Sequence, residues 1–299
     1  MSYHNPVLLF ESVDGLDIVQ DGVYVDVTFG GGGHSKEILK RLGADGKLFA
    51  FDQDEDALKN SINDGRFTLI HENFRYVKRF LRFYGIKKVN GILADLGVSS
   101  HQFDEASRGF STRFDADLDM RMFKGSKKNA AHIINKYSQE RLADILFLYG
   151  DLRNSRALAK QIVESRNEES IQTSFQLKEA LQKFLPKSKE HKILAQIFQA
   201  IRIEVNEELD ALKEFLLQTE ELLDVGGKLS VISYHSLEDR LVKRYVRSGL
   251  FEGEPEKDFY GNITVPFKKG KLITPSKIEI KENNRARSAK LRIATRIDG

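Results

Sequence analysis

The residues best suited to chemistry lie in a glycine-rich segment near the start of the chain. Asp26 ends an apolar stretch there and is followed by four consecutive glycines at positions 30–33. Glycine turns at positive φ and lets backbone N–H groups approach a ligand, because it has no Cβ. Asp52 lies about 20 residues further on, after a second apolar stretch, where an acid can bind ribose hydroxyls. The segment predicts a site for a nucleotide-type cofactor, and a glycine-rich turn without a ligand is the alternative.

The spacing within this segment indicates which cofactor binds. A dinucleotide-binding loop carries a third glycine three positions after its second glycine, but Ser35 follows Gly32 at that distance. NAD is therefore disfavoured. The pattern Asp26-x-x-x-Gly30-x-Gly32 instead resembles motif I of S-adenosylmethionine-dependent methyltransferases, so we expect S-adenosyl-L-methionine as the cofactor.

Asp95 marks a second candidate site at the end of another apolar stretch, Ile92-Leu-Ala-Asp95. Ligands of open α/β sheets bind at the carboxyl ends of the strands, which places Asp95 in the crevice near the glycines. In amino-methyltransferases a short polar residue here accepts a hydrogen bond from the target amine. The main task is alignment of reacting atoms roughly 3–3.5 Å apart. A helix N-cap at a strand end is the alternative role.

Tyr234 and His235 follow a further strand that should lie beside the strand of Asp95. This position brings both side chains near the amine, where they either line a base pocket or serve only in packing. Ser236 and Asp239, just beyond them, resemble a helix cap.

The elements that must position these residues alternate between strands and helices from Val23 to about Asp95. A helical stretch from about Ser138 to Leu223 interrupts them, and Thr173-Ser-Phe-Gln176 is typical of a capping box within it. We expect an α/β fold: a Rossmann-like class I methyltransferase sheet with an inserted all-helical domain. The expected domains are 1–104 with 219–299, and 105–218. The expected strands are 23–28, 47–51, 67–70, 89–94 and 228–233, with a last pair at 277–281 and 289–296 after a Pro/Gly-rich loop at 252–276.

Composition restricts the class of protein further. The chain has 299 residues, 40% of them hydrophobic, and no cysteine. Disulfides and thiolate zinc sites are therefore excluded, and we expect no metal. The N-terminus lacks a signal-peptide pattern and no apolar run approaches the roughly 18 residues that span a bilayer, so we expect a cytoplasmic protein with no membrane partner.

Positive charge is concentrated in two segments although the net charge is only +3. Between Lys268 and Arg296 ten Lys or Arg residues face two acids, a local charge of +8 (10 − 2). A second basic stretch, Arg75, Lys78, Arg79 and Arg82, has i, i+3, i+4, i+7 spacing and is therefore expected to form one face of a helix. Phosphate backbones are the obvious partner, and a solvated surface is the alternative.

The longer motifs give a more specific resemblance, which covers nearly the whole chain. The sequence is similar to the RsmH (MraW) family, which methylates the exocyclic amine of a cytosine in bacterial small-subunit ribosomal RNA. The resemblance implies cofactor contacts from Gly32, Gly33, His34, Asp52, Phe74, Asp95 and Gln102, although Phe74, Gln102 and His34 also suit packing or capping roles. The motifs that carry it are His4-Asn-Pro-Val-Leu-Leu, Asp26-Val-Thr-Phe-Gly-Gly-Gly-Gly-His-Ser, Asp95-Leu-Gly-Val-Ser-Ser, Arg108-Gly-Phe-Ser, Leu118-Asp-Met-Arg121, Ser233-Tyr-His-Ser-Leu-Glu-Asp-Arg240 and Asn284-Arg-Ala-Arg-Ser.

We therefore expect methylation of the N4 amine of a cytosine in 16S rRNA at the ribosomal decoding centre. Arg113, Arg121 and the helical domain would bind RNA, and a homodimer is among the oligomeric states that we consider. A DNA amino-methyltransferase is a rival function, although Leu96 to Ser100 replaces its usual Pro-Pro-aromatic motif. The other rivals are a small-molecule methyltransferase, which would not need the basic tail, and a non-catalytic ribosome-assembly factor, which would tolerate loss of Asp95.

Overall fold

The structure is a computed structural model that describes residues 6–298 apart from 256, 258 and 262. His4 and Asn5 of the N-terminal motif lie outside the described residues. The chain divides into two compact units, a sheet unit of Met1–Gly97 with Leu209–Gly299 and a helical unit of Val98–Glu208.

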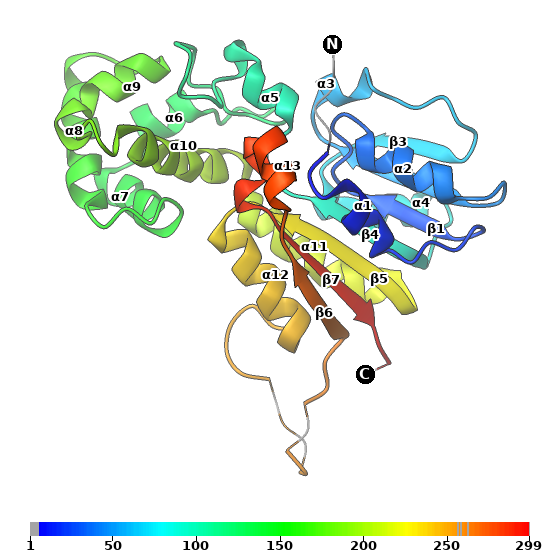
Figure 1. Ribbon diagram of the computed structural model, residues 1–299. Coiled ribbons are helices and arrows are strands. Elements are labelled where there is room, and N and C mark those ends of the chain that lie inside the picture. Colours follow the sequence, from blue (N-terminus) through cyan, green and yellow to red (C-terminus); the bar gives the residue numbers. More distant parts are fainter. Residues whose placement is uncertain (1–5, 256, 258, 262, 299) are drawn as a thin grey trace. The chain divides into compact units, whose positions relative to one another are not determined.

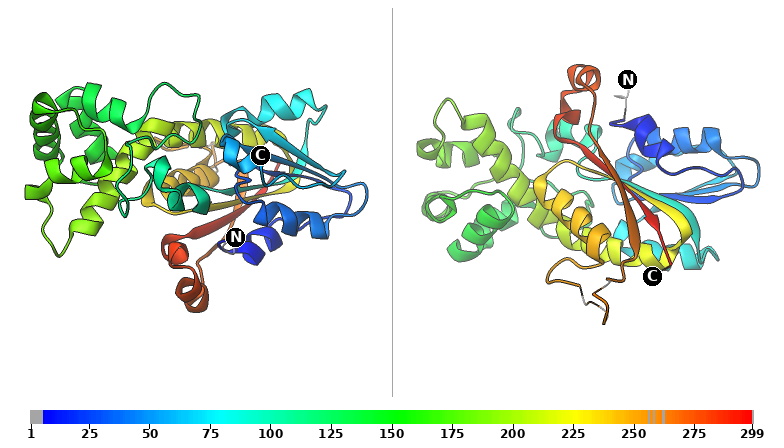
Figure 2. Two further views of the ribbon diagram at one scale, coloured as in Figure 1. Left: turned by 90° about the horizontal axis from the view of Figure 1, so that it is seen from above. Right: turned by 60° about the horizontal axis from the view of Figure 1, so that its bottom comes forward.

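The sheet unit contains seven strands in the order β3-β2-β1-β4-β5-β7-β6. The first five strands are parallel, whereas β7 is antiparallel to both of its neighbours. Figures 1 and 2 show β7 lying between β5 and β6. The strands are β1 (Val23–Asp26), β2 (Lys47–Asp52), β3 (Phe67–His71), β4 (Val89–Asp95), β5 (Leu223–Ser233), β6 (Phe267–Ile273) and β7 (Lys290–Arg296).

Helices cover both faces of this sheet, because its connections change direction after β3. On one face Leu48 and Leu93 pack against the first two helices, while on the other Phe49 and Ile92 pack against the later ones. Successive strand residues thus face opposite layers, so the strands are almost continuously apolar. The first layer is α1 (Leu9–Asp14), α2 (Gly33–Arg41) and α3 (Glu55–Leu58), and the second is α4 (Val77–Phe83), α11 (Glu208–Leu222) and α12 (Ser236–Ser248).

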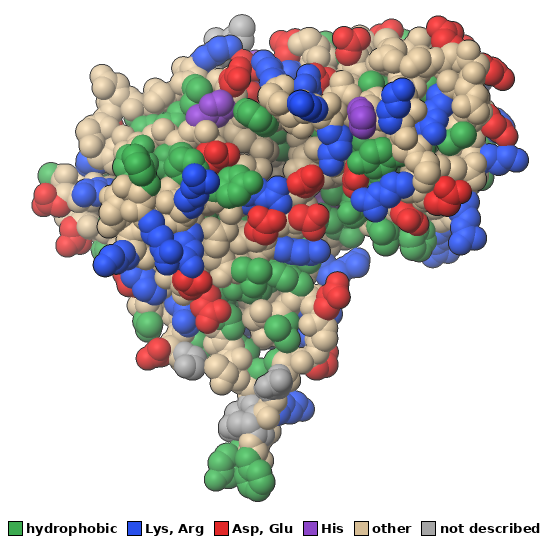
Figure 3. Space-filling view, turned by 180° about the vertical axis from the view of Figure 1, so that it is seen from behind, with side chains coloured by type: hydrophobic (Ala, Val, Ile, Leu, Met, Phe, Trp, Pro, Cys, Tyr) green, Lys and Arg blue, Asp and Glu red, His purple; other side chains and the backbone are tan. Residues whose placement is uncertain are grey.

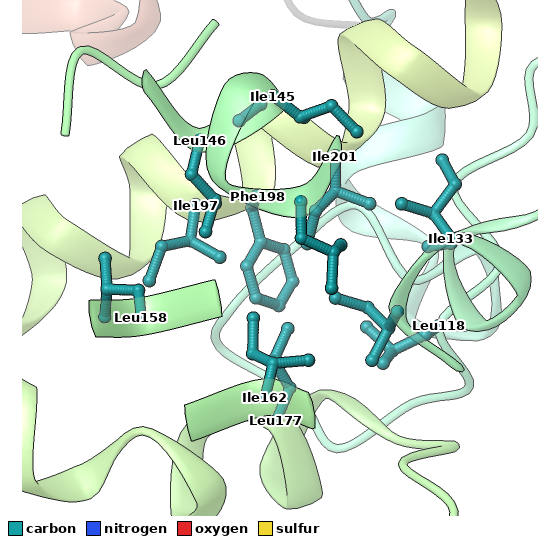
Figure 4. Close-up of a cluster of buried hydrophobic side chains, with 14 of the residues drawn as sticks. Leu118, Ile133, Ile145, Leu146, Leu158, Ile162, Leu177, Ile197, Phe198 and Ile201 are labelled. Carbon is teal, nitrogen blue, oxygen red and sulfur yellow. The ribbon is translucent and has the colours of Figure 1, made fainter. Parts of the chain in front are cut away.

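The helical unit has its own hydrophobic core, shown in Figure 4. Ile133, Leu158, Ile162 and Ile197 are fully buried in it. The capping box predicted at Thr173 is confirmed, since its side chain accepts from the N–H of Gln176 and the Gln176 side chain accepts in return. The unit contains α5 (Ser100–Asp104), α6 (Ala130–Lys136), α7 (Gln139–Leu148), α8 (Ser155–Glu168), α9 (Ser174–Ala180) and α10 (Glu190–Asn206), with 3-10 turns at Ala106–Arg108 and Gln182–Phe184.

The division between the units falls at Val98 and Glu208, whereas the sequence suggested 105 and 218. At the second boundary the reason is α11, whose apolar residues Leu212, Phe215 and Leu216 pack against the sheet. Most of this helix therefore belongs to the sheet unit.

The sequence prediction was wrong for one strand near the C-terminus. Residues 277–281, expected as a strand, form helix α13 (Lys277–Glu282), because the Ser276 side chain caps it by accepting from the N–H of Glu279. The strand that pairs with β7 on the side away from β5 is instead β6, which lies within the segment 252–276 that was expected to be a loop. The sheet unit also contains two 3-10 turns, Phe74–Tyr76 and Asn284–Ser288.

Among the described residues, no helix is both long and apolar enough to cross a membrane.

Candidate active site

The glycine segment forms a tight loop between β1 and α2. Gly30 and Gly32 have φ of 49° and 74°, a left-handed conformation that favours glycine. A Cβ on Gly33 would lie 2.1 Å from Cγ of Pro6, so this position also requires glycine. No side chain caps α2, whose N-cap residue is Gly32. The loop therefore presents backbone N–H groups at a helix N-terminus, where a polar ligand group is stabilised.

Two acids hold this loop in place. The carboxylate of Asp26 is fully buried and accepts from Ser35 Oγ at 2.7 Å and from the N–H of Thr28 at 3.1 Å. Asp52, at the end of β2, accepts from the N–H of Gly30 at 2.7 Å and from the N–H of Asp54 at 2.8 Å. Each acid thus links a strand end to the glycine loop or to α2, which fixes the shape of the loop.

Asp95 lies at the end of β4 beside the same loop. Its N–H donates to Thr28 Oγ1 at 2.6 Å, and its Oδ1 accepts from the hydroxyl of Tyr234 at 2.8 Å. Nδ1 of His34 is 3.9 Å from Asp95 Oδ2. The Asp95 side chain is 23% exposed, so it is held by neighbours but still open to a reactant.

Burial dominates the electrostatics of these groups. It raises the pKa of Asp95 to about 6, although the nearby His34 and the hydrogen bond from Tyr234 act in the opposite direction. Burial likewise raises the pKa of Asp52 to about 6, and it raises the pKa of Asp26. The pKa of the His34 imidazole is lowered by burial, so this ring is neutral near pH 7. Three acids of raised pKa therefore surround one loop, an environment that favours a bound cation.

His235 and Glu238 form a capping box at the start of α12, one residue earlier than the cap expected at Ser236 and Asp239. Glu238 Oε2 accepts from the N–H groups of Tyr234 at 2.9 Å and His235 at 3.2 Å. Nδ1 of His235 accepts from the N–H of Glu238. Asp239 instead binds Lys290 and Arg292 of β7. The cap fixes the backbone that carries Tyr234 toward Asp95.

Thr28 and Glu238 orient Asp95 and Tyr234, and the sequence pattern alone assigned neither of them a role. Thr28 had a detectable signal, as a hydroxyl residue between the acid and the glycines. The signal for Glu238 was its position three residues after a polar residue at the start of a helix.

Two of the expected cofactor residues also make structural contacts. The ring of Phe74, in the turn after β3, packs edge-to-face on Phe215 with centroids 5.5 Å apart. Gln102, in the helical unit, completes a capping box with Ser99 at the start of α5.

Several of the basic residues considered for RNA binding are held in ion pairs. Arg121 binds Asp119 and the backbone carbonyls of Lys124 and Ser126. Arg113 is half exposed and lies 3.1 Å from Asp104. Arg121 therefore stabilises its own loop, whereas Arg113 remains accessible at the surface.

The residues of the sheet unit fit an S-adenosylmethionine cofactor. The glycine loop offers backbone donors, Asp52 offers a carboxylate at the end of β2, and the three acids suit the positive charge of a sulfonium. A sheet of this strand order, with an antiparallel β7 and this loop after β1, defines a class I S-adenosylmethionine-dependent methyltransferase.

Comparison with known proteins identifies the family. The chain belongs to the MraW methylase family, whose model matches residues 1–297. It is 71% identical to ribosomal RNA small subunit methyltransferase H of Christiangramia forsetii, over 99% of both chains. The proteins of the same name from Flavobacterium johnsoniae and Bacteroides thetaiotaomicron are 67% and 56% identical, over 99% and 98% of this chain and 99% and 97% of theirs.

Proposed function

We propose that this enzyme transfers a methyl group from S-adenosylmethionine to the exocyclic N4 amine of a cytosine in 16S rRNA, at the decoding centre of the small ribosomal subunit. The names of its relatives support a small-subunit rRNA substrate. The observation that carries the choice of an amine is the Asp95 carboxylate, which lies beside the glycine loop with Oδ1 bound by Tyr234. Its Oδ2 has no hydrogen bond within the described part of the chain and is in place to accept one from an amine.

Asp95 orients the target in this mechanism. By accepting a hydrogen bond from the amine, it fixes the direction of the nitrogen lone pair. Tyr234 donates a hydrogen bond to Oδ1 of Asp95. The neutral ring of His34 lies beside Oδ2, with Nδ1 3.9 Å away, and adds no competing charge. When bound, the cofactor would supply an electrophilic methyl group, and its sulfonium would leave as a neutral thioether. When the nitrogen has formed its new bond to carbon it loses a proton, and Asp95, with a pKa near 6, is placed to receive it.

The cofactor contacts that we propose are Gly32, Gly33, His34, Asp52, Phe74, Asp95 and Gln102. Gly32 and Gly33 offer the uncapped start of α2, and Asp52 offers a carboxylate for the ribose. Phe74, only partly buried, offers an apolar ring for the adenine. Gln102 rests on the family resemblance.

Substrate recognition must deliver a single cytosine into the site. A base within folded RNA has to be turned out of its stack before its amine can reach the donor. We assign RNA binding to the helical unit, including Arg113, and to the basic C-terminal segment. Tyr234 and His235 are candidates for the wall of the cytosine pocket.

The test is transfer of labelled methyl from S-adenosylmethionine to purified 30S subunits, to naked rRNA and to DNA, with mass spectrometry of the digested nucleosides. We expect N4-methylcytidine with the wild type and a loss of at least about 100-fold in methyl transfer with Asp95→Ala. Label in DNA but not in RNA would favour a DNA amino-methyltransferase. Cofactor binding without any label would favour an assembly factor.

A further inference from the structure

Helix α4 carries a cluster of basic residues, and part of this cluster fastens it to α11. Arg75, just before the helix, forms an ion pair with Glu214, with Nη2 and Oε1 2.5 Å apart. Lys78 forms another with Glu221. Gln218 adds two hydrogen bonds, accepting from the N–H of Lys78 and donating to the carbonyl of Arg75. These two cations therefore serve the packing of α4.

The remaining cations of α4 have no such role. Arg79 and Arg82 are exposed, and neither forms an ion pair within the described part of the chain. Arg82 contributes to lowering the pKa of Glu221, but Lys78 is the main cause. Arg79 and Arg82 thus present positive charge to solvent.

Exposed aromatic rings lie among these arginines. Tyr76 is the N-cap residue of α4, and Arg79 and Phe83 follow it at spacings of three and four residues, so the three form one stripe along this side of the helix. The exposed fractions of Tyr76 and Phe83 are 42% and 82%. The opposite side of α4 packs on the sheet through Val77 and Leu81, which are fully buried. The core therefore does not account for Phe83.

The ring of Phe83 is held against its neighbour rather than lying alone. It is perpendicular to the ring of Tyr84, with centroids 5.3 Å apart, and Tyr84 in turn contacts Phe49 of the sheet at 5.4 Å. Figure 3 views this side of the sheet unit, and basic side chains lie among hydrophobic ones on it. Tyr76, Arg79, Arg82 and Phe83 are called the α4 stripe below.

We infer that the α4 stripe binds an unpaired segment of the RNA substrate. Arginines neutralise phosphates, and an exposed ring can stack on a base regardless of its identity, so cations beside aromatic rings match single-stranded nucleic acid. The stripe begins close to the carboxyl end of β3. The last residue of β3, His71, pairs with Asp52 at the end of β2, which is one of the proposed cofactor contacts. An RNA segment bound to the stripe would lead away from the edge of the sheet at which Asp52 and Asp95 lie. This inference rests on the proposed rRNA substrate.

The test compares three variants with the wild type in methylation of small-subunit RNA and in binding to a single-stranded oligonucleotide. They are Arg79→Gln/Arg82→Gln, Phe83→Ala and the conservative Phe83→Tyr. The charge-matched control, Lys40→Gln/Lys59→Gln, changes two exposed lysines on α2 and beside α3, in the layer on the other face of the sheet. Cofactor affinity and melting temperature are measured for each protein.

We expect the double arginine variant to lower the slope of log affinity against log salt by about 1.4, because each phosphate contact on a single strand contributes about 0.7. Phe83→Ala should raise KM for RNA about tenfold, and Phe83→Tyr should restore it. Cofactor affinity and the rate at saturating RNA should stay unchanged. The control should keep the wild-type slope.

Wild-type affinity and slope in both the arginine and the alanine variants would overturn the inference, as would an equal loss in the lysine control. If Phe83→Ala converts a dimeric wild type into a monomer in sedimentation without affecting RNA affinity, the stripe is an interface with a second copy instead. A wild type that methylates no rRNA would refute the proposed function, so the two failures are distinguishable.

Discussion

Asp95 lies between a hydrogen-bond donor and a ring that is neutral near pH 7. The hydroxyl of Tyr234 favours the ionised carboxylate, whereas burial disfavours it and raises the pKa of Asp95 to about 6. Most of the Asp95 population is therefore ionised at pH 7, but the group remains basic enough to accept a proton.

This balance makes Tyr234 testable through the pH dependence of the reaction. The rate of methyl transfer should fall as pH drops through about 6, because a protonated Asp95 no longer accepts the hydrogen bond of the amine. In Tyr234→Phe the ionised carboxylate loses its donor, so its pKa rises and the acidic limb should move up by about one pH unit. The measurement is kcat/KM for RNA against pH, which reports the pKa of the enzyme before RNA binds.

The control is Tyr245→Phe, which removes the hydroxyl of a buried tyrosine on α12 in contact with Phe251 and Phe267. This variant should leave the acidic limb of the pH–rate profile at its wild-type pH. An unchanged limb in Tyr234→Phe would show that another group governs the acidic side of the profile.

Among the elements, α12 and β7 are joined by a small ion-pair network. Asp239 on α12 lies 2.7 Å from Nε of Arg292 and 3.1 Å from Nζ of Lys290, both on β7. Burial alone would raise the pKa of Asp239, but Arg292 and Lys290 outweigh it and lower the pKa. Two residues of the basic C-terminal segment therefore hold α12 against β7.

We expect Asp239→Asn to lower the free energy of unfolding by about 1–3 kcal/mol at pH 7, since it leaves two cations without their partner. Because the folded pKa is lowered, the stabilisation is complete above the unfolded value of about 3.9 and is lost as pH falls through the folded pKa. Urea unfolding at pH 7 and at pH 3 measures both effects. A difference between the proteins that is equal at the two pH values would contradict this assignment.

The sequence was informative for the parallel strands because they are buried on both faces and read as short apolar runs. It failed for β6, where Lys268, Lys269 and Lys271 are all exposed, since an edge strand needs few apolar residues. Residues 277–281 alternate like a strand, but the Ser276 cap makes them helical.

For the candidate site, the sequence located the acids and glycines, whose types are dictated by local backbone and chemistry. It did not reveal which groups contact one another. The bond between Tyr234 and Asp95 joins residues 139 positions apart, and only the strand order brings them together.

At the scale of the whole molecule, the helical unit is one continuous stretch of chain with a separate core. Twenty-five buried residues form this core, and all of them lie between Phe110 and Val205. We expect residues 98–208, expressed alone, to fold and to melt cooperatively by circular dichroism, because domains with their own core fold independently. A fragment with a helical spectrum that lacks a cooperative transition would show that its packing depends on the sheet unit.

The position of β7 has a consequence for synthesis of the protein. Since β7 pairs with β5 on one side and β6 on the other, the seven-stranded sheet cannot be completed until β7 has left the ribosome. Until then the nascent chain carries β5 as an open edge, which can pair with other chains. A product that ends before β7 would keep every candidate catalytic residue and still lack a completed sheet. We expect proteases to degrade such a product before it can work as an enzyme.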